Sequence, residues 1–132
     1  MGERWTLLIV RDAFLGLRRF EEFQENLGIA RNVLTDRLNR LVEEGIFERV
    51  RYSERPERYE YKLTAKGREL GVPLAALRQW GDKRVSEKPH RILRRKADKK
   101  PVIVAFVPKG APVLRFDEVE SVPGPGADVK VA

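Results

Sequence analysis

The spacing of apolar side chains changes at Gly45, and this change limits the folds that the chain can form. In the segment before it, 30–44, apolar residues recur at steps of three and four, the spacing of one buried helix face: Leu34, Leu38, Leu41 and Val42. After Gly45 apolar and polar residues alternate, first in "IFERVRY" and again in "RYEYKLT". The polar segment "SERPE" lies between these two runs. A helix followed directly by a two-stranded hairpin is therefore expected.

Two further helices are expected before residue 30. The stretch "ERWTLLIVRDAFLG" is apolar around most of its circumference, and Gly16 ends it. The stretch "RRFEEFQENLG" places its apolar residues on one face and has Gly28 as a C-terminal stop. Only Gly28 and Ile29 separate this helix from the next one. Two short helices joined by a tight turn with glycine are typical of a helix-turn-helix.

The sequence after the hairpin predicts a further helix and then a set of short strands. Thr64 is a candidate N-cap for a helix from Ala65 to about Val85, in which Pro73 introduces a kink. The stretch "SEKPHRILRRKADKK" is expected to be a linker. The stretch "PVIVAFVPKGAPVLRF" predicts two strands around a turn, and "DEVESV" a third short strand.

These elements predict an α+β fold, a winged helix-turn-helix domain with a small C-terminal β-strand extension. The expected division is a winged helix-turn-helix domain at 1–86, a basic linker at 87–100, the β-strand extension at 101–122 and a flexible tail at 123–132. The apolar stripe of the last helix is longer than one small domain needs, which predicts burial in a homodimer: Leu70, Leu74, Leu77 and Trp80.

The chain carries a net charge of +7, which favours an acidic partner such as nucleic acid. The excess is local: residues 1–77 hold 14 Lys and Arg against 13 Asp and Glu, whereas residues 78–100 hold 10 against 3. The second stretch is either a solvated linker or a cationic arm that binds phosphates. The arm would use Arg84, Arg91, Arg94, Arg95, Lys99 and Lys100.

In a winged helix the third helix enters the major groove of double-stranded DNA, and the hairpin tip reaches the flanking backbone. The polar side of the helix at 30–44 suits this role, because asparagine can pair with adenine and arginine with guanine or phosphate. Asp36 could accept from a cytosine amine, although near phosphates it would more often repel. The candidate DNA-binding residues are Arg31, Asn32, Thr35, Asp36, Arg37 and Arg40 on the helix, and Arg55 and Arg58 on the hairpin.

Over about residues 2–82 the sequence resembles the HxlR family of prokaryotic winged-helix transcription regulators. The resemblance is carried by Trp-Thr-Leu-Leu-Ile, Arg-Arg-Phe, Leu-Thr-x-Arg-Leu, Pro-x-Arg-x-x-Tyr and Leu-Thr-x-x-Gly. It implies a homodimer, acting as a repressor on an inverted-repeat operator, with 30–44 as the reading helix and 52–59 as the wing. Family members usually begin with a further segment that often holds a sensing cysteine. Here Met1 directly precedes the first matching helix and the sequence has no cysteine, so thiol sensing does not carry over.

Other functions have less support in the sequence. Without cysteine, and with His90 as the single histidine, the sequence predicts no metal site, no cofactor and no serine triad, and the P-loop, GxGxxG and HExxH motifs are missing. The protein is therefore not expected to be an enzyme. No apolar run approaches the roughly 20 residues that span a bilayer, so no membrane partner and a cytoplasmic location are expected. One alternative remains: a small-molecule-sensing or protein-docking module in which the C-terminal strands carry the main role, with an unknown effector.

Overall fold

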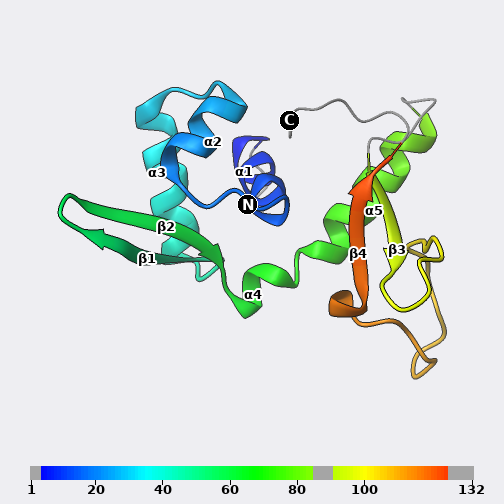
Figure 1. The fold of residues 1–132 in the computed structure, drawn as a ribbon. Coiled ribbons are helices and arrows are strands. Elements are labelled where there is room, and N and C mark those ends of the chain that lie inside the picture. The colour runs from blue at the N-terminus through cyan, green and yellow to red at the C-terminus, as the bar shows by residue number, and fades with distance from the viewer. Residues whose placement is uncertain (1–3, 85–90, 125–132) are drawn as a thin grey trace. The chain divides into compact units, whose positions relative to one another are not determined.

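The structure is a computed structural model that describes residues 4–84 and 91–124. The chain forms two compact units that meet in the sequence between Leu70 and Gly71. The described residues of unit 1 are 4–70, and those of unit 2 are 71–84 and 91–124. Figure 1 labels the helices and strands of both units.

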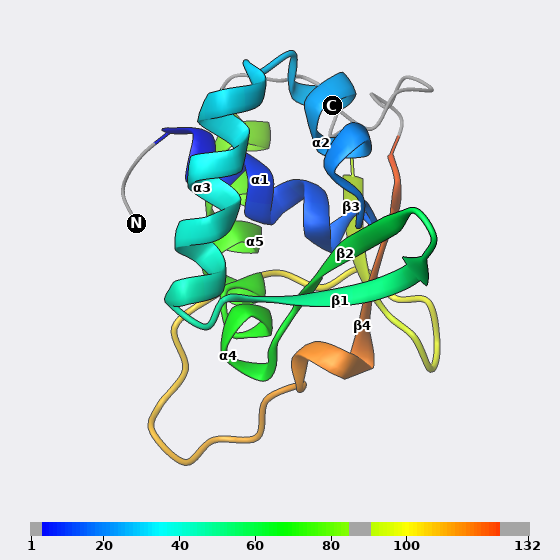
Figure 2. The ribbon, with the colours of Figure 1, turned by 90° about the vertical axis from the view of Figure 1, so that its left-hand side faces the viewer.

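Unit 1 begins with three helices in the predicted order: α1 (Arg4–Phe14), α2 (Phe20–Leu27) and α3 (Arg31–Glu43). Gly28 ends α2 with a φ of 62°, and its N–H donates to the carbonyl of Gln24 at 2.9 Å. This left-handed conformation is easily adopted only by glycine, which explains why the chain can turn here so sharply. The predicted short turn between the second and third helices is confirmed (Figure 2).

The hairpin that follows α3 is also confirmed. Gly45, with a φ of 77°, closes α3, and the next residue donates from Ile46 N to the carbonyl of Leu41 at 2.9 Å. Strands β1 (Phe47–Glu54) and β2 (Glu57–Leu63) then pair antiparallel and leave only two residues at the tip. The strands therefore reach further toward the tip than the sequence predicts.

The register of the hairpin shifts once. Arg51 lies opposite Tyr59, but the next pair is Ser53 with Arg58, so Tyr52 is the extra residue of a β-bulge. On β2, successive side chains point to opposite faces. Arg58 therefore lies on the face opposite to that of Tyr59.

The segment between α1 and α2 lies along the outer edge of β2. Tyr61 N donates to the carbonyl of Arg18 at 2.7 Å, and Arg19 forms a bridge with Glu60. The side chain of Glu22 accepts from the backbone N–H groups of Arg18 and Arg19 at 3.1 and 2.8 Å, which stabilises the start of α2. The base of the hairpin is thus fixed to the helix-turn-helix.

The apolar core of unit 1 lies between its three helices and the base of the hairpin. The rings of Phe23 and Phe47 are 6.2 Å apart at its centre, between α2 and β1. The buried apolar residues of unit 1 are Ile9, Val10, Ala13, Leu17, Phe23, Ile29, Leu34, Leu38, Leu41, Ile46 and Phe47. The leucines of α3 are therefore buried on the side that the sequence pattern predicts.

Helix α4 (Ala65–Arg68) closes unit 1, and Thr64 caps it as predicted. The Thr64 hydroxyl accepts from Gly67 N at 3.0 Å and donates to the carbonyl of Gly45. Gly67 is buried, and a Cβ at this position would lie 2.2 Å from the carbonyl oxygen of Ile46. The glycine thus allows α4 to pack directly on the backbone that joins α3 to β1.

The single helix expected from Ala65 to Val85 is not formed, and this prediction was wrong. The chain forms α4 and then α5 (Gly71–Arg84), with Glu69 and Leu70 between them. The break places Pro73 in the first turn of α5. A backbone N–H at this position has no acceptor within the helix, so proline removes no helical hydrogen bond there. In a continuous helix the same proline would have clashed with the preceding turn.

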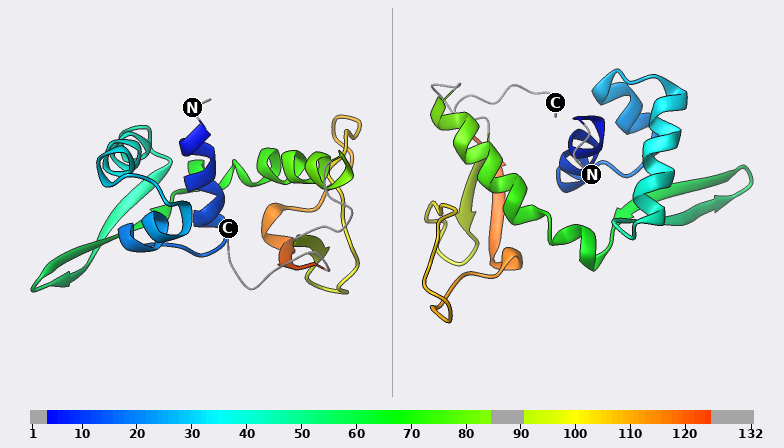
Figure 3. Two further views of the ribbon diagram at one scale, coloured as in Figure 1. Left: turned by 90° about the horizontal axis from the view of Figure 1, so that it is seen from above. Right: turned by 180° about the vertical axis from the view of Figure 1, so that it is seen from behind.

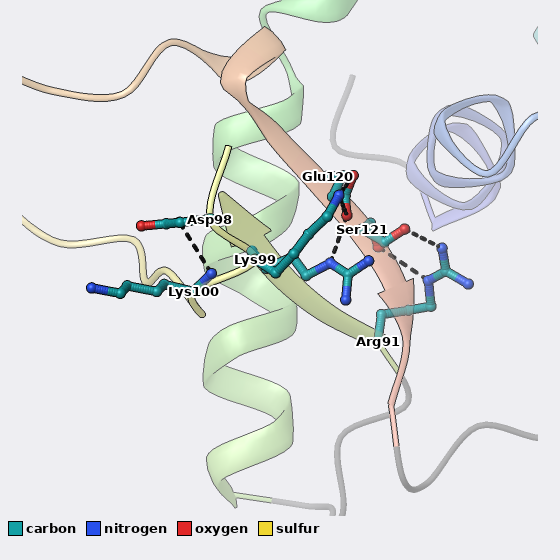
Figure 4. A network of polar contacts seen from close by, with 7 residues as sticks. Arg91, Asp98, Lys99, Lys100, Glu120 and Ser121 are labelled. Carbon is teal, nitrogen blue, oxygen red and sulfur yellow. Dashed lines mark hydrogen bonds and ion pairs between the residues drawn. The ribbon is translucent and has the colours of Figure 1, made fainter. Parts of the chain in front are cut away.

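In unit 2, α5 packs against a two-stranded antiparallel sheet of β3 (Arg91–Arg95) and β4 (Val119–Pro123) (Figure 4). A short 3₁₀ turn, η1 (Phe116–Glu118), leads into β4. Leu93 faces Ser121 across the sheet, and Arg94 faces Glu120. The third predicted strand, in "DEVESV", corresponds to β4 and is confirmed.

Two other expectations for unit 2 were wrong. Part of the expected linker, at 91–95, is strand β3, and the two strands expected within 101–116 are not formed apart from one bridge between Arg94 and Pro101. Prolines lack the N–H that a β-ladder needs, and Pro101, Pro108 and Pro112 interrupt the apolar segment. The expected flexible tail begins inside β4, and the rest of it, like His90, lies outside the described residues, except Gly124.

None of the described helices is long and apolar enough to cross a membrane.

Candidate nucleic-acid interface

The side of α3 opposite the core is polar and exposed. Its exposed residues include Asn32, Thr35, Asp36 and Arg40, as predicted, and also Asn39, which the list of candidate residues omitted. Asn39 lies two turns beyond Asn32 on the same side of the helix, so helical periodicity alone could have identified it. The structure thus brings together two amides, a hydroxyl, a carboxylate and a guanidinium on one continuous face.

Several of these side chains have partners within α3. The Thr35 hydroxyl donates to the carbonyl of Arg31 at 2.9 Å, which leaves its oxygen able to accept. The carboxylate of Asp36 pairs with Arg37 at 2.5 Å. Arg37 lies at the border of the exposed face, with its side chain 26% exposed. The ion pair reduces the negative charge that Asp36 presents at this face.

The other two arginines of α3 are held at opposite ends of the helix. The guanidinium of Arg31 stacks over the ring of Phe20 at 4.7 Å, which positions it beside the start of α3. Arg40 pairs with Glu44 at 3.3 Å, and its side chain remains 68% exposed. A surface pair of this kind is worth little energy, so the Arg40 side chain can exchange this partner for another.

The start of α3 lacks a side-chain cap, because its N-cap residue is Ala30. The first backbone N–H groups of a helix have no acceptor inside the helix, and here no side chain of the N-cap supplies one. Such an end carries a partial positive charge that favours an anion. The first turn of α3 therefore suits a phosphate beside Arg31 and Asn32.

The hairpin tip carries charges of both signs. Arg55 lies at the tip and Arg58 in β2, and both are exposed. Glu54 faces Glu57 across the hairpin, and Glu57 pairs with Arg51 at 3.8 Å. Within the part of the chain that the structure describes, no ion pair engages Arg55 or Arg58. The tip projects away from the helices of unit 1 (Figure 3), which leaves these two guanidinium groups accessible.

The hairpin also holds three arginine–tyrosine stacks that the sequence analysis missed. Arg49 lies 4.2 Å and Arg51 6.0 Å from the ring centre of Tyr59, and Arg19 lies 4.3 Å from that of Tyr52. In the hairpin register, Arg49 lies opposite Tyr61 and Arg51 opposite Tyr59. Pairing the two predicted strands could therefore have indicated contacts between arginine and tyrosine. These contacts hold cationic side chains along the wing.

A buried carboxylate links the first two helices of unit 1. Asp12 is fully buried and accepts from the Arg11 guanidinium at 3.0 and 3.1 Å. Its second oxygen accepts from the amide of Asn26 on α2 at 2.7 Å. This bond fixes the position of α2 relative to α1, and through the short turn it constrains where α3 begins.

The basic stretch of unit 2 is largely paired (Figure 4). Arg91 donates to Ser121 at 2.9 and 3.1 Å, and Glu120 pairs with Arg94 and with Lys99 at 2.5 and 3.2 Å. These hydrogen bonds, from Arg94 above all and then from Lys99, hold the pKa of Glu120 below its usual value. Arg95 pairs with Asp98 at 3.4 Å. Four of the six cations that were predicted to bind phosphates from the basic stretch thus have a partner in unit 2. Their phosphate binding stays a prediction.

No cluster of histidine, cysteine or carboxylate side chains suited to a metal ion occurs among the described residues.

Two curated relatives each match this chain over slightly more than 80 residues. The uncharacterised HTH-type transcriptional regulator Rv3095 of Mycobacterium tuberculosis is 57% identical over 82 residues, which are 62% of this chain and 52% of Rv3095. The chain thus spans about half the length of that relative. The HTH-type transcriptional regulator YodB of Bacillus subtilis is 34% identical over 83 residues, 62% of this chain and 74% of YodB.

Solved structures confirm the winged-helix fold. The crystal structure of PA1607, described as a candidate transcription factor, is 44% identical with a TM-score of 0.70 and covers 83% of this chain and 78% of its own. PA1374 of Pseudomonas aeruginosa, described in the same way, is 40% identical with a TM-score of 0.57 and covers 97% and 89%. Reduced YodB from B. subtilis is 32% identical with a TM-score of 0.56 and covers 65% and 85%.

The profile of the HxlR-like helix-turn-helix family matches residues 1–89, which contain α3, the hairpin and the motifs described above. This range is more than half of the chain. The chain therefore belongs to the HxlR-like helix-turn-helix family.

Proposed function

We propose that this protein is a sequence-specific DNA-binding transcription regulator, with α3 as the reading helix and the β1–β2 hairpin as the wing. The observation that carries the proposal is the polar face of α3, because it combines exposure with side chains that suit base edges. Asn32 and Asn39 are exposed amides, and an amide can donate to and accept from one adenine. A solvated face with no further role would not need amides at these positions, since Lys and Glu form helices better.

Phosphate contacts are expected on both sides of that face. The uncapped start of α3 and the guanidinium of Arg31 lie at one end, and Arg55 and Arg58 lie on the hairpin. Phosphate contacts set the position of a protein on the duplex, and base contacts supply the specificity. The same division of roles is expected here.

The protein is proposed to act as a homodimer on an inverted repeat, with its two reading helices about 34–36 Å apart. A two-fold dimer presents the same reading face twice, so the operator has the matching symmetry. Repression is expected where such an operator overlaps a promoter. The relatives named above are transcriptional regulators, which supports this role.

The first experiment finds the operator and then tests the reading helix. Genomic fragments bound by the full chain are selected and sequenced, and binding to single-base variants of the operator is then measured for Asn32→Ala and Thr35→Ala. Each variant should lose about 1–3 kcal/mol of discrimination at one base position for a good contact. Glu25→Ala, an exposed change on α2, is the control. An unchanged base preference in both variants would contradict the role of α3.

The second experiment tests the wing. The double variant Arg55→Ala with Arg58→Ala should weaken binding to operator and to random DNA by similar factors, because phosphate contacts carry no sequence information. Lys62→Ala removes one positive charge near the base of the same hairpin and serves as the matched control. If the double variant binds both DNAs as the parent does, the wing is not part of the interface.

A further inference from the structure

The apolar surface of unit 2 is unusually exposed. All nine large apolar side chains that are exposed among the described residues belong to this unit: Val72, Leu77, Trp80, Ile103, Phe106, Val107, Val113, Leu114 and Phe116. Its buried apolar residues, by contrast, reduce to Ala75 among those described. A folded unit of this size needs a larger apolar core than one alanine.

Six of these side chains lie in one segment, 103–116, which we name the arm. Apart from the short turn η1 at its end, the arm is extended and forms no helix or strand. Its first part is fixed to α5, because the Gln79 amide donates to the carbonyl of Val104 at 2.9 Å and accepts from its N–H at 2.8 Å. Its end is fixed to α5 by Phe116, whose ring lies 2.3 Å from where a Cβ of Gly71 would be.

Between these two anchors the arm leaves the body of unit 2, as the orange segment in Figures 1 and 2 shows. A tight turn reverses its direction, with Ala111 N donating to the carbonyl of Pro108 at 3.0 Å and Gly110 at a φ of 87°. Phe106 is fully exposed, at 107% of its reference area, and Ile103 is 77% exposed. Both side chains are therefore largely open to solvent.

The second exposed apolar surface is one side of α5. Leu77 and Trp80 are one turn apart and are 58% and 63% exposed, and Val72 on the same half of the helix is 50% exposed. The opposite side of α5 contains the buried residues Gly71 and Ala75 and faces the sheet. The exposed side of α5 is therefore not covered by the elements of its own unit.

A second copy of this chain is the occupant that the observations favour. No large apolar side chain of unit 1 is exposed among its described residues, so unit 1 has little apolar surface to match the arm. Unit 2 of another copy supplies both complementary parts. Between 103 and 116 the arm carries only Lys109 and Arg115 as charges, and Arg115 pairs with Asp117 at 3.0 Å. The arm thus brings little unpaired charge to the contact.

The amount of surface is also sufficient. Aromatic side chains bury about 150–250 Å² each, so Trp80, Phe106 and Phe116 offer on the order of a few hundred Å² per copy, and six aliphatic side chains add to this area. A standard interface buries roughly 800 Å² on each partner, whereas monomers rarely expose apolar patches of such size. In a two-fold dimer the contact forms twice, because each chain supplies one arm and one α5 surface.

We propose that the arm is exchanged between two copies: the part between its two anchors, residues 105–115 of each chain, lies on the exposed side of α5, formed by Val72, Leu77 and Trp80, of the other chain. This inference adds to the proposed function by naming the surface that holds the homodimer together. Only its consequence for DNA binding rests on the proposed function. The dimer would then be lost when the arm is altered, even though unit 1 stays intact.

The absence of cysteine from the sequence allows a direct test by cross-linking. Val107→Cys on the arm and Leu77→Cys on α5 are made as separate full-length variants, mixed, allowed to exchange subunits and treated with a short bismaleimide. A product of twice the chain mass should form in the mixture. A mixture of Val107→Cys with Glu43→Cys, an exposed position on α3, is the control and should give no such product.

Three outcomes would overturn the proposal. The first is no cross-link in the mixture of arm and α5 variants. The second is a product from Val107→Cys alone that is as abundant as the product from the mixture, which would indicate pairing between arms. The third is an internal cross-link in the double variant Leu77→Cys with Val107→Cys at high dilution, because the arm would then close on its own helix.

A second measurement separates the arm from the general stability of the chain. Phe106→Ser with Val113→Ser changes only exposed side chains, so unit 1 should stay folded by circular dichroism. Sedimentation should show a dimer dissociation constant raised roughly tenfold or more, as for the loss of apolar anchors in other interfaces. Lys109→Ser, at the exposed turn of the arm, is the control and should leave the constant unchanged. An unchanged dimer in the double variant would overturn the proposal.

Binding to a duplex with one half-site distinguishes this inference from the proposed function. If the arm variant binds the half-site as the parent does but loses its advantage on the full repeat, both proposals are supported. If the parent is dimeric and cross-links as expected but prefers no DNA sequence, the proposed function fails while the exchanged arm stands.

Discussion

The two units of this protein place their apolar side chains in opposite ways. Unit 1 buries eleven large and small apolar residues in one core, from Ile9 to Phe47, and exposes no large apolar side chain among those described. Among its described residues, unit 2 buries one apolar residue, Ala75, and exposes nine large ones. Its elements are connected by the β3–β4 ladder, by half-buried apolar side chains such as Leu93 and Val122, and by surface ion pairs that each contribute little free energy. Unit 1 therefore satisfies the physical requirements of an independent domain, whereas unit 2 requires a partner surface.

The largest expected effect tests how tightly unit 1 is packed. Gly67→Ala places a Cβ 2.2 Å from the carbonyl oxygen of Ile46, and backbone cannot move aside as a flexible side chain can. The free energy of unfolding should fall by about 3 kcal/mol or more, measured by urea denaturation.

The matched control for Gly67→Ala is Gly81→Ala in α5 of unit 2, where a Cβ would have nothing within 4 Å. This change should raise helix stability by about 0.5–1 kcal/mol. Equal effects of the two substitutions would remove the contrast in packing between the units.

The buried carboxylate gives the next largest effect. Asp12→Ala removes the acceptor for Arg11 and Asn26, and Asn26 then loses its partner in a partly buried place. We expect the free energy of unfolding to fall by about 2–3 kcal/mol. Glu44→Ala, which removes the exposed partner of Arg40, should cost at most about 0.5 kcal/mol. A loss below 1 kcal/mol for Asp12→Ala would show that α1 and α2 are held by apolar contacts alone.

The two tryptophans report on the two units separately. Trp5 lies in α1 and Trp80 in α5, so Trp5→Phe leaves a fluorescence signal from unit 2 and Trp80→Phe leaves one from unit 1. If unit 2 is completed by association, its unfolding free energy should rise by about 1.4 kcal/mol for each tenfold increase in protein concentration. The Trp5 signal should change less. A Trp80 transition that is independent of concentration would show that unit 2 is stable by itself.

The smallest effect concerns the ion pairs of unit 2. The pKa of Glu120 is lowered from its ordinary value of 4.5 in the folded state, so its ionised form stabilises unit 2 above about pH 4.5. That contribution is lost as the pH falls through the lowered pKa. Glu120→Gln should therefore weaken unit 2 slightly at pH 7, and the difference from the parent should vanish in acid. A difference that persists at low pH would mean that Glu120 acts through packing and not through its charge.

Much of unit 1 was predictable because its determinants are local. The leucines of α3 recur with the helical period, Gly28 and Gly45 supply left-handed turns, and Thr64 caps the helix that follows it. Each of these signals lies within a few residues of the structure that it determines. The exposed face of α3 follows directly from the buried one, so most of the candidate site could be placed as well.

Unit 2 was harder to predict because its determinants are distant in the sequence. The run "RILRR" carries the charges of a linker, yet it becomes β3 because Glu120 and Ser121 provide partners for Arg94 and Arg91 some 26 to 30 positions away. The run "VIVAFV" has the apolar content of a strand, but it remains extended without a ladder partner. The stacks on Tyr59 and the bond from Asn26 to Asp12 likewise depend on the folded arrangement.

The alternation of side chains along β1 and β2 determines how the hairpin distributes its positive charge. Before the bulge, Arg49 and Arg51 share the face of Tyr59, and beyond it Arg58 projects from the opposite face of β2. The hairpin is thus cationic on both sides and not on one. A ribbon of this kind is suited to enter a channel between two negatively charged walls, as between the strands that border a groove, more than to lie flat on a single one.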